Sequence, residues 1–280
     1  MGSCVLLQRD MDMSSSTTPS FRFTVASSAA VWIAHAAAVT VFLLGMMSCN
    51  RNEQSGTDPG TPAVQSLQLI TTYSLTVTEP SGLAYSPVTR MLYMISDNRS
   101  EIFRIDTTGK VLSSIPVAAS DIEGIAVSNS GDTLYIVEET ASLLSTVLMN
   151  GTKISSVSVV VRTDPKHSLE GVTVDNAGHL VVINEKTPTM LLEFAGSTEV
   201  RRLLLTYSSD ISDICYDAGG NCFWIVSDES QKVMKLSRAG VLLGEWSIPV
   251  QQGEGIAFIR DRFYIVSDVD AKLYVFVKPS

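Results

Sequence analysis

Short apolar runs alternate with polar turn residues from Leu67 to the end of the sequence. The runs are rich in Val, Ile, Tyr, Phe and Thr, and Gly, Asn and Asp stand between them, which is typical of β-strands joined by tight turns. No stretch in this region has the spacing of an amphipathic helix. The pattern predicts an all-β domain over residues 67–280.

A five-residue phrase recurs in this domain at intervals of 42, 47, 42 and 42 residues, and each copy is followed 14 to 16 residues later by an acid that ends an apolar run. A strand-rich repeat of this length is typical of a β-propeller or a solenoid. The copies are Ser81–Tyr85, Glu123–Val127, Glu170–Val174, Ser212–Tyr216 and Glu254–Phe258.

Each repeat divides into four strands, but the fifth ends before its outer strand. The segment Tyr73–Val77 precedes the first phrase and can supply the missing strand, which would close the ring and protect its edges. We therefore predict a five-bladed β-propeller with four-stranded antiparallel blades. Six blades are the alternative if Leu67–Ile70 belongs to a degenerate extra blade.

Strand geometry places the start of each first strand and the end of each second strand on one rim of the channel. That rim would carry many carboxylates, which raise one another's pKa unless a cation neutralises them. Oxygen ligands with few His or Cys residues favour Ca²⁺ or Mg²⁺. We predict a divalent-cation site, with calcium as the ion, at this mouth. The predicted ligands are Glu123, Glu170, Glu254 and Asp213.

The acids that end the second strands are interpreted differently. All five repeats have one, which favours a structural role repeated in every blade, such as accepting backbone N–H groups, over a role in one asymmetric site. These acids are Asp97, Glu139, Glu185, Asp228 and Asp268; Glu138 is expected at the same rim.

The region before the domain predicts export. Residues 29–47 are apolar and almost uncharged, and the tetrad that ends at Cys49 resembles a bacterial lipobox. We predict a signal peptide over 1–48, lipid attachment at Cys49, a polar linker over 49–66, and a folded domain outside the cytoplasm in a bacterial cell envelope. An uncleaved anchor helix or a plain secretory signal is the alternative.

Charge and cysteine content add three constraints. The net charge of −9 is unfavourable for nucleic acid, whose phosphates require Lys and Arg. An exported protein could bridge Cys215 and Cys222, but the expected hairpin register puts Cys222 opposite Ala218 and favours free thiols. No Cys and His cluster indicates zinc. We expect a monomer.

Three phrases, Glu-Gly-Ile-Ala-Val, Leu-Glu-Gly-Val-Thr-Val and Gly-Glu-Gly-Ile-Ala-Phe, together with Glu79–Tyr85 and Ile95–Asn98, resemble the SdiA-regulated domain family of YjiK-like β-propeller lipoproteins. The resemblance covers roughly residues 70–278. It implies a propeller similar to NHL-type and gluconolactonase-like propellers, often exported and membrane-anchored, and it implies no established activity. Glu123, Glu170 and Glu254 match the kind of position that binds metal in calcium-dependent lactonases, whereas Ser81 and Ser212 depart from it.

Three functions follow as hypotheses. The first is a membrane-anchored propeller that binds a cation and a small or peptide-like ligand at its acidic mouth. The second is a calcium-dependent lactonase or esterase, in which His167 and Glu170 are the candidates for a general base. The third is a protein-interaction scaffold without a small-molecule site.

Overall fold

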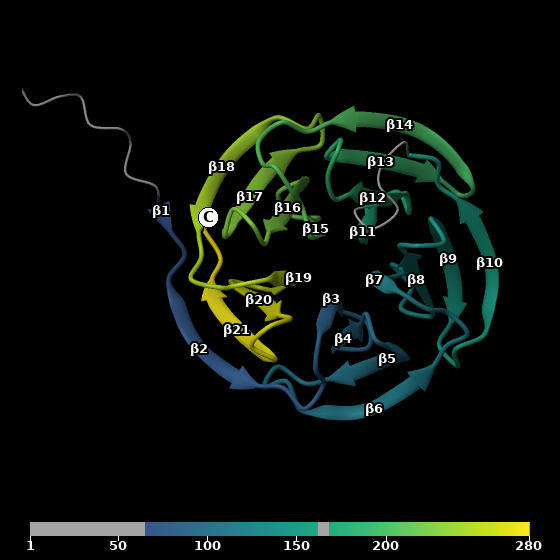
Figure 1. The fold of residues 1–280 in the computed structure, drawn as a ribbon, viewed down its shortest axis with the longest axis horizontal. Helices are drawn as coiled ribbons and strands as arrows, with labels where there is room; N and C mark the ends of the chain where they lie inside the picture. The colour runs from purple at the N-terminus through teal and green to yellow at the C-terminus, as the bar shows by residue number, and fades with distance from the viewer. Residues whose placement is uncertain (1–64, 162–167, 280) are drawn as a thin grey trace, which may run out of the picture. The chain divides into compact units, whose positions relative to one another are not determined.

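The computed structural model describes residues 65–161 and 168–279, which form five antiparallel sheets arranged as a ring around a central channel (Figure 1). The described residues contain no helix. Blade one is β3 (Pro80–Ser86), β4 (Met91–Ser96), β5 (Arg99–Ile105) and β6 (Val111–Pro116); blade two is β7 (Ile122–Val127), β8 (Thr133–Glu138), β9 (Leu143–Leu148) and β10 (Lys153–Ser158); blade three is β11 (Leu169–Val174), β12 (Leu180–Asn184), β13 (Met190–Ala195) and β14 (Thr198–Leu204); blade four is β15 (Asp213–Asp217), β16 (Cys222–Ser227), β17 (Lys232–Ser237) and β18 (Leu242–Ser247); blade five is β19 (Gly253–Ile259), β20 (Arg262–Ser267), β21 (Lys272–Val277) and β2 (Leu69–Ser74).

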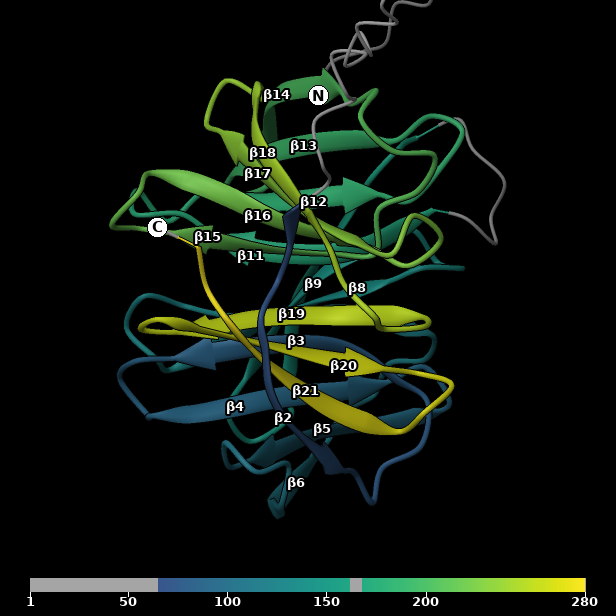
Figure 2. The same ribbon diagram turned by 90° about the vertical axis from the view of Figure 1, so that its left-hand side faces the viewer.

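The ring is closed by the strand that precedes the first phrase. β2 pairs antiparallel with β21, from Leu69 opposite Phe276 to Ser74 opposite Lys272, and forms the outer edge of blade five (Figure 2). The predicted five blades and their closure are therefore confirmed. The six-bladed alternative is wrong, because Leu67 packs into the core between blades four and five and the next residues enter β2.

A short extra strand, β1 (Gln65–Ser66), pairs parallel with β18 on the outside of blade four. The Trp246 indole N–H donates to Gln65 Oε1 at 3.0 Å, and the Ser66 and Ser247 hydroxyls lie 2.7 Å apart. The described chain therefore crosses from the edge of blade four to the edge of blade five before it enters the first phrase.

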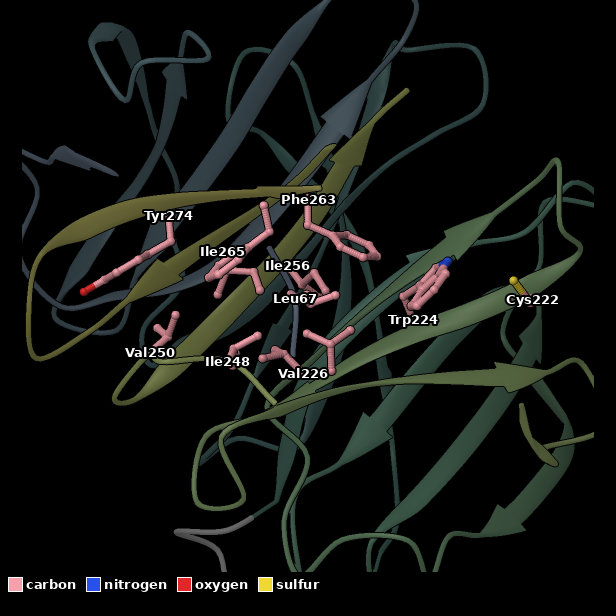
Figure 3. Packing of buried hydrophobic residues seen from close by; sticks show 12 residues of the cluster. Leu67, Cys222, Trp224, Val226, Ile248, Val250, Ile256, Phe263, Ile265 and Tyr274 are labelled. Carbon is pink, nitrogen blue, oxygen red and sulfur yellow. The ribbon is translucent and has the colours of Figure 1, made fainter. Parts of the chain in front are cut away.

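The core lies between neighbouring blades, because each blade buries both faces of its inner strands. Figure 3 shows the cluster between blades four and five, in which the rings of Trp224 and Phe263 meet edge to face with centroids 4.9 Å apart. Every residue of β16 is buried, which explains why its sequence is apolar without alternation.

Cys215 and Cys222 are both free thiols. Cys222 lies opposite Asp217, one residue from the predicted partner Ala218, because the hairpin pairs Asp213 with Val226. The register differs by one residue from the prediction, but the expectation of two free thiols holds and the alternative of a disulfide is wrong.

The innermost strands converge at the phrase glycines. A Cβ atom on Gly124 would lie 2.1 Å from the backbone oxygen of Glu170 in the next blade, and one on Gly255 would lie 2.9 Å from the backbone of Gly82. Only a residue without a side chain permits this approach of two strands. The glycines therefore determine how tightly the ring closes around its axis and hold the neighbouring phrase acids close together.

Candidate metal centre at the acidic mouth of the channel

The phrase acids lie at one mouth of the channel, at the beginning of the innermost strands. Glu123 is the second residue of β7, Glu170 of β11 and Glu254 of β19. Burial raises the pKa of Glu123, and the negative charges of Asp97, Glu139, Asp121 and Glu254 raise it further. The structure thus brings acids from four blades together, as the strand geometry predicted.

Two groups of three carboxylates have oxygen atoms that lie within 4.8 Å of one another. Asp121, Glu123 and Glu139 form the first group, and Glu139, Glu170 and Glu185 form the second. A Ca²⁺ ion takes oxygen ligands at about 2.3–2.6 Å. Two oxygens on opposite sides of one ion therefore lie about 5 Å apart, which is close to the separation within each group. Glu139 belongs to both groups and links blade two to blade three.

Burial and mutual repulsion both favour protonation at this mouth. Burial raises the pKa of Glu123 to about 9 and that of Glu254 to about 8, and neighbouring carboxylates add to both shifts. Burial also raises the pKa of Glu170 well above its usual range, with further contributions from Glu123, Glu254 and Glu185. A site with these properties favours a bound cation, because a cation offsets the repulsion that the carboxylates otherwise relieve by taking up protons.

Glu254, on β19 of blade five, belongs to a second part of the mouth, where it meets residues of blade four. The Ser212 hydroxyl donates a hydrogen bond to Glu254, and among the neighbouring charges that of Asp228 raises the pKa of Glu254 most. Burial raises the pKa of Asp228 to about 7, helped by its hydrogen bond with Asp210. Asp210 is fully buried and also accepts from Ser227 Oγ at 2.8 Å. Glu254 lies in neither of the two carboxylate groups that share Glu139.

Asp213 lies on the axis of the ring, where the other four phrases have glycine. One carboxylate oxygen accepts the backbone N–H of Ile214 and the other accepts that of Ile256, both at 2.8 Å, and Leu83 adds a third backbone N–H. The side chain is fully buried. Asp213 therefore connects blades four, five and one, and both of its oxygens are used in doing so.

The acids that end the second strands have several kinds of partner. Glu139 Oε1 accepts the backbone N–H of Ser168 at 2.9 Å, and Glu185 forms an ion pair with Lys186 at 2.7 Å. Burial raises the pKa of both Asp97 and Asp268. The prediction that Glu138 adds to the rim is wrong, because its carboxylate forms an ion pair with Lys153 of β10, at 2.8 Å.

Two acids of this mouth were missed by the sequence argument. Asp121 lies two residues before Glu123 and accepts the backbone N–H of Thr140 at 2.9 Å, and Asp210 lies two residues before Ser212. Their common position relative to the phrase is a signal that the sequence contained. The two serines that stand where other phrases have Glu also have partners. Ser81 Oγ donates to the backbone oxygen of Ile122 at 2.8 Å, and the Ser212 hydroxyl donates to Glu254.

A third group, Asp175, His179 and Glu193, also has oxygen and nitrogen atoms within 4.8 Å of one another. Arg238 lies 2.8 Å from both carboxylates, and Arg201 lies 2.7 Å from Glu193. The two guanidinium groups already neutralise these acids. This group is therefore an ion-pair network and not a candidate metal site.

The sequence model of the SdiA-regulated family matches residues 70–206 and 197–278, which together span the propeller. The chain belongs to the SdiA-regulated family. The resemblance that the phrases indicated is thus confirmed over the folded domain.

Solved structures show the same fold at low sequence identity. The glutaminyl cyclase of Myxococcus xanthus is 16% identical with a TM-score of 0.59, and the match covers 76% of this chain and 97% of that one. The Xanthomonas campestris protein XC5397, described as a gluconolactonase, is 14% identical with a TM-score of 0.50, covering 80% and 99%. A nidogen/laminin complex chain is 16% identical with a TM-score of 0.52, covering 67% and 72%. At these identities the likeness of the SdiA-regulated propeller to them concerns the fold alone.

Some predictions for this SdiA-regulated chain lie outside the described residues. These are His167 as a candidate for a general base beside Glu170, the leader over 1–48 and the lipid attachment at Cys49. The lactonase or esterase hypothesis and the anchor therefore stay predictions. Across residues 65–161 and 168–279, no helix is long and apolar enough to span a membrane.

Proposed function

We propose that the acidic mouth binds a divalent cation, calcium, and that this ion is the means by which the propeller holds a small or peptide-like ligand. The observation that carries the proposal is the pair of carboxylate groups that share Glu139, with ligand atoms within 4.8 Å of one another. Glu123 and Glu170 come from adjacent blades. The acids of the two groups together are called the central set: Asp121, Glu123, Glu139, Glu170 and Glu185.

The donor chemistry supports calcium over softer metals. The central set consists of carboxylate oxygens, which suit Ca²⁺ and Mg²⁺, whereas zinc and copper sites usually include His or Cys. Calcium accepts six to eight oxygens in variable geometry, whereas magnesium needs a nearly ideal octahedron with several waters. A dense and irregular set of carboxylates fits calcium better.

The surroundings also favour a bound cation at this mouth. Lys186 pairs with Glu185 and Glu229, both at 2.7 Å, and lies at the edge of the central set. Asp268 has a carboxylate oxygen that is buried without a hydrogen-bond partner among the described residues. An ion with open coordination positions would also present a binding point for the oxygens of a ligand.

Calcium is expected to raise the melting temperature of the folded protein. An ion at one hundred times its Kd stabilises by about 2.7 kcal/mol, which is about 5–10 °C for a domain of this size. The measurement is calorimetric melting at pH 7.5 in calcium and in excess chelator. Glu139→Gln should remove most of the calcium-dependent shift, because Glu139 belongs to both carboxylate groups.

Asp261→Asn is the matched control for that experiment. It removes one carboxylate from the turn between β19 and β20, at the opposite end of the channel, and should keep the full calcium response. Equal melting temperatures of the unaltered protein with calcium and with chelator would overturn the cation proposal. A full response in Glu139→Gln would overturn the assignment of Glu139 as the shared ligand.

We also propose that the propeller is lipid-anchored at Cys49 in a bacterial cell envelope, on the strength of the apolar stretch and lipobox-like tetrad before it. Cys49→Ser is expected to release the protein from the membrane fraction, measured by fractionation and detergent partitioning. Cys4→Ser is the control and should leave the protein with the membranes. Continued retention of Cys49→Ser would favour an uncleaved helix instead.

A further inference from the structure

The end of the channel opposite the acids contains a cavity of about 500 Å³. This volume lies within the range of small-molecule sites, about 300–1,000 Å³. All five blades line it, and the fourth residue of every phrase belongs to the lining. These residues are Ala84, Ala126, Thr173, Cys215 and Ala257. Because each is small, the channel stays open at this level.

The wall of the cavity is largely apolar and aromatic. Tyr85, Tyr216 and Phe258, each the fifth residue of its phrase, contribute rings from blades one, four and five. Its inner end is formed by the branched residues that directly follow the axial glycines and Asp213, namely Leu83, Ile125, Val172 and Ile214. The cavity thus ends at the level of the buried Asp213 side chain, and the phrase acids lie one residue further along the strands.

Two charged side chains line the cavity, and one of them is already neutralised. Asp217 accepts from Lys278 Nζ at 2.8 Å, from the Trp224 indole N–H at 3.4 Å and from two backbone N–H groups. Arg260 is exposed on the turn between β19 and β20, and no residue in the described part of the chain forms a hydrogen bond or ion pair with its guanidinium. The free charge offered to a ligand is therefore positive, although the protein as a whole is acidic.

We propose that this cavity binds a small organic anion that has an aromatic or alicyclic body and one carboxylate or sulfonate group. The body lies between Tyr85, Tyr216 and Phe258, where the area removed from water provides the affinity. The anionic group pairs with Arg260, whose planar guanidinium suits such groups. This site is separate from the proposed cation site and does not depend on it.

The first test uses two fluorescent probes of nearly the same shape, the anionic 8-anilinonaphthalene-1-sulfonate and the neutral N-phenyl-1-naphthylamine, titrated in chelator. We expect one anionic probe per folded chain. Arg260→Gln should raise the Kd of the anionic probe about tenfold, as expected for loss of a charged hydrogen bond. The Kd of the neutral probe should change less than twofold.

Two variants sharpen this comparison. Arg262→Gln removes the same charge two residues away, outside the cavity lining, and should leave both probes unaffected. Arg260→Lys should keep most of the affinity for the anionic probe. An unchanged Kd in Arg260→Gln, or an equal loss for both probes, would overturn the anion assignment.

The cavity itself is tested by filling it. Ala84→Leu and Cys215→Phe place larger side chains on opposite parts of the lining and should abolish binding of both probes, while thermal melting stays cooperative. Full probe binding in a folded filled variant, or several weakly bound probes per chain, would overturn the site. Should either variant fail to fold, the Arg260 series still decides the proposal.

Discussion

Gly124→Ala is expected to lower the melting temperature by about 10 °C or more, because it overpacks the tightest point of the ring. The added Cβ would lie 2.1 Å from the backbone oxygen of Glu170 and 2.9 Å from Gly171 Cα. The Val137 side chain, 2.3 Å away, can rotate, but the backbone of the next blade can move only if blades two and three separate. Calorimetric melting in chelator measures the effect without a contribution from bound ions.

Gly219→Ala is the matched control. Its Cβ would be 3.5 Å from the nearest atom, Asp217 Oδ1, which is ordinary contact, so the melting temperature should stay within about 2 °C of the original. If the two variants had the same melting temperature, the argument that the phrase glycines set the width of the ring would be wrong. Gly124→Ala should also weaken the calcium response, because it displaces Glu170.

The metal-free protein is expected to lose stability as the pH rises from about 5 to 9. The pKa values of Asp228, Glu254 and Glu123 are about 7, about 8 and about 9 in the folded protein. In the unfolded chain such groups ionise near pH 4. Between these values the folded state holds more protons, so the free energy of unfolding decreases with pH. Their stabilising contribution is complete below the unfolded pKa and disappears as the pH passes 7, 8 and 9.

The expected size is a fall in melting temperature of about 10 °C or more between pH 5 and pH 9 in chelator. The window begins at pH 5 because paired acids such as Glu193, whose pKa is lowered, act in the opposite direction in more acidic solution. Glu123→Gln should flatten the curve, and saturating calcium should restore stability at pH 9, where the carboxylates bind it without releasing protons. A melting temperature that is constant or rises over this window would contradict the burial of these acids as uncompensated carboxyl groups.

Much of the architecture was predictable because it depends on a periodicity. The regular spacing of the phrases determines the number of blades, and the truncated fifth repeat identifies the need for a closing strand. The exact hairpin register was not predictable, since one residue in the turn before Cys222 decides whether Ala218 or Asp217 lies opposite it. Nothing in the apolar pattern distinguishes the two registers in a strand that is buried throughout.

The candidate site was predictable in location but not in detail. Strand geometry brings Glu123, Glu170 and Glu254 to one mouth, yet the partners of Glu139 come from the folded arrangement of two blades. Asp213 shows the limit most clearly. Its carboxylate accepts backbone N–H groups from the third phrase residue of three different blades. No local sequence pattern therefore distinguishes an acid that holds these strands together from one that faces the mouth.

The pairing of β2 with β21 has a consequence for the order of folding. It joins Leu69 to Phe276, about 200 residues apart, and contacts of such high contact order form late and slowly. Until β21 has been synthesised, β2 has no partner strand in blade five and β20 is paired on one side only, with β19, so both present open edges that can pair with strands of other chains. A chain that stops before Lys272 is therefore expected to aggregate, and the growing chain depends on β21 to protect the edge of β2.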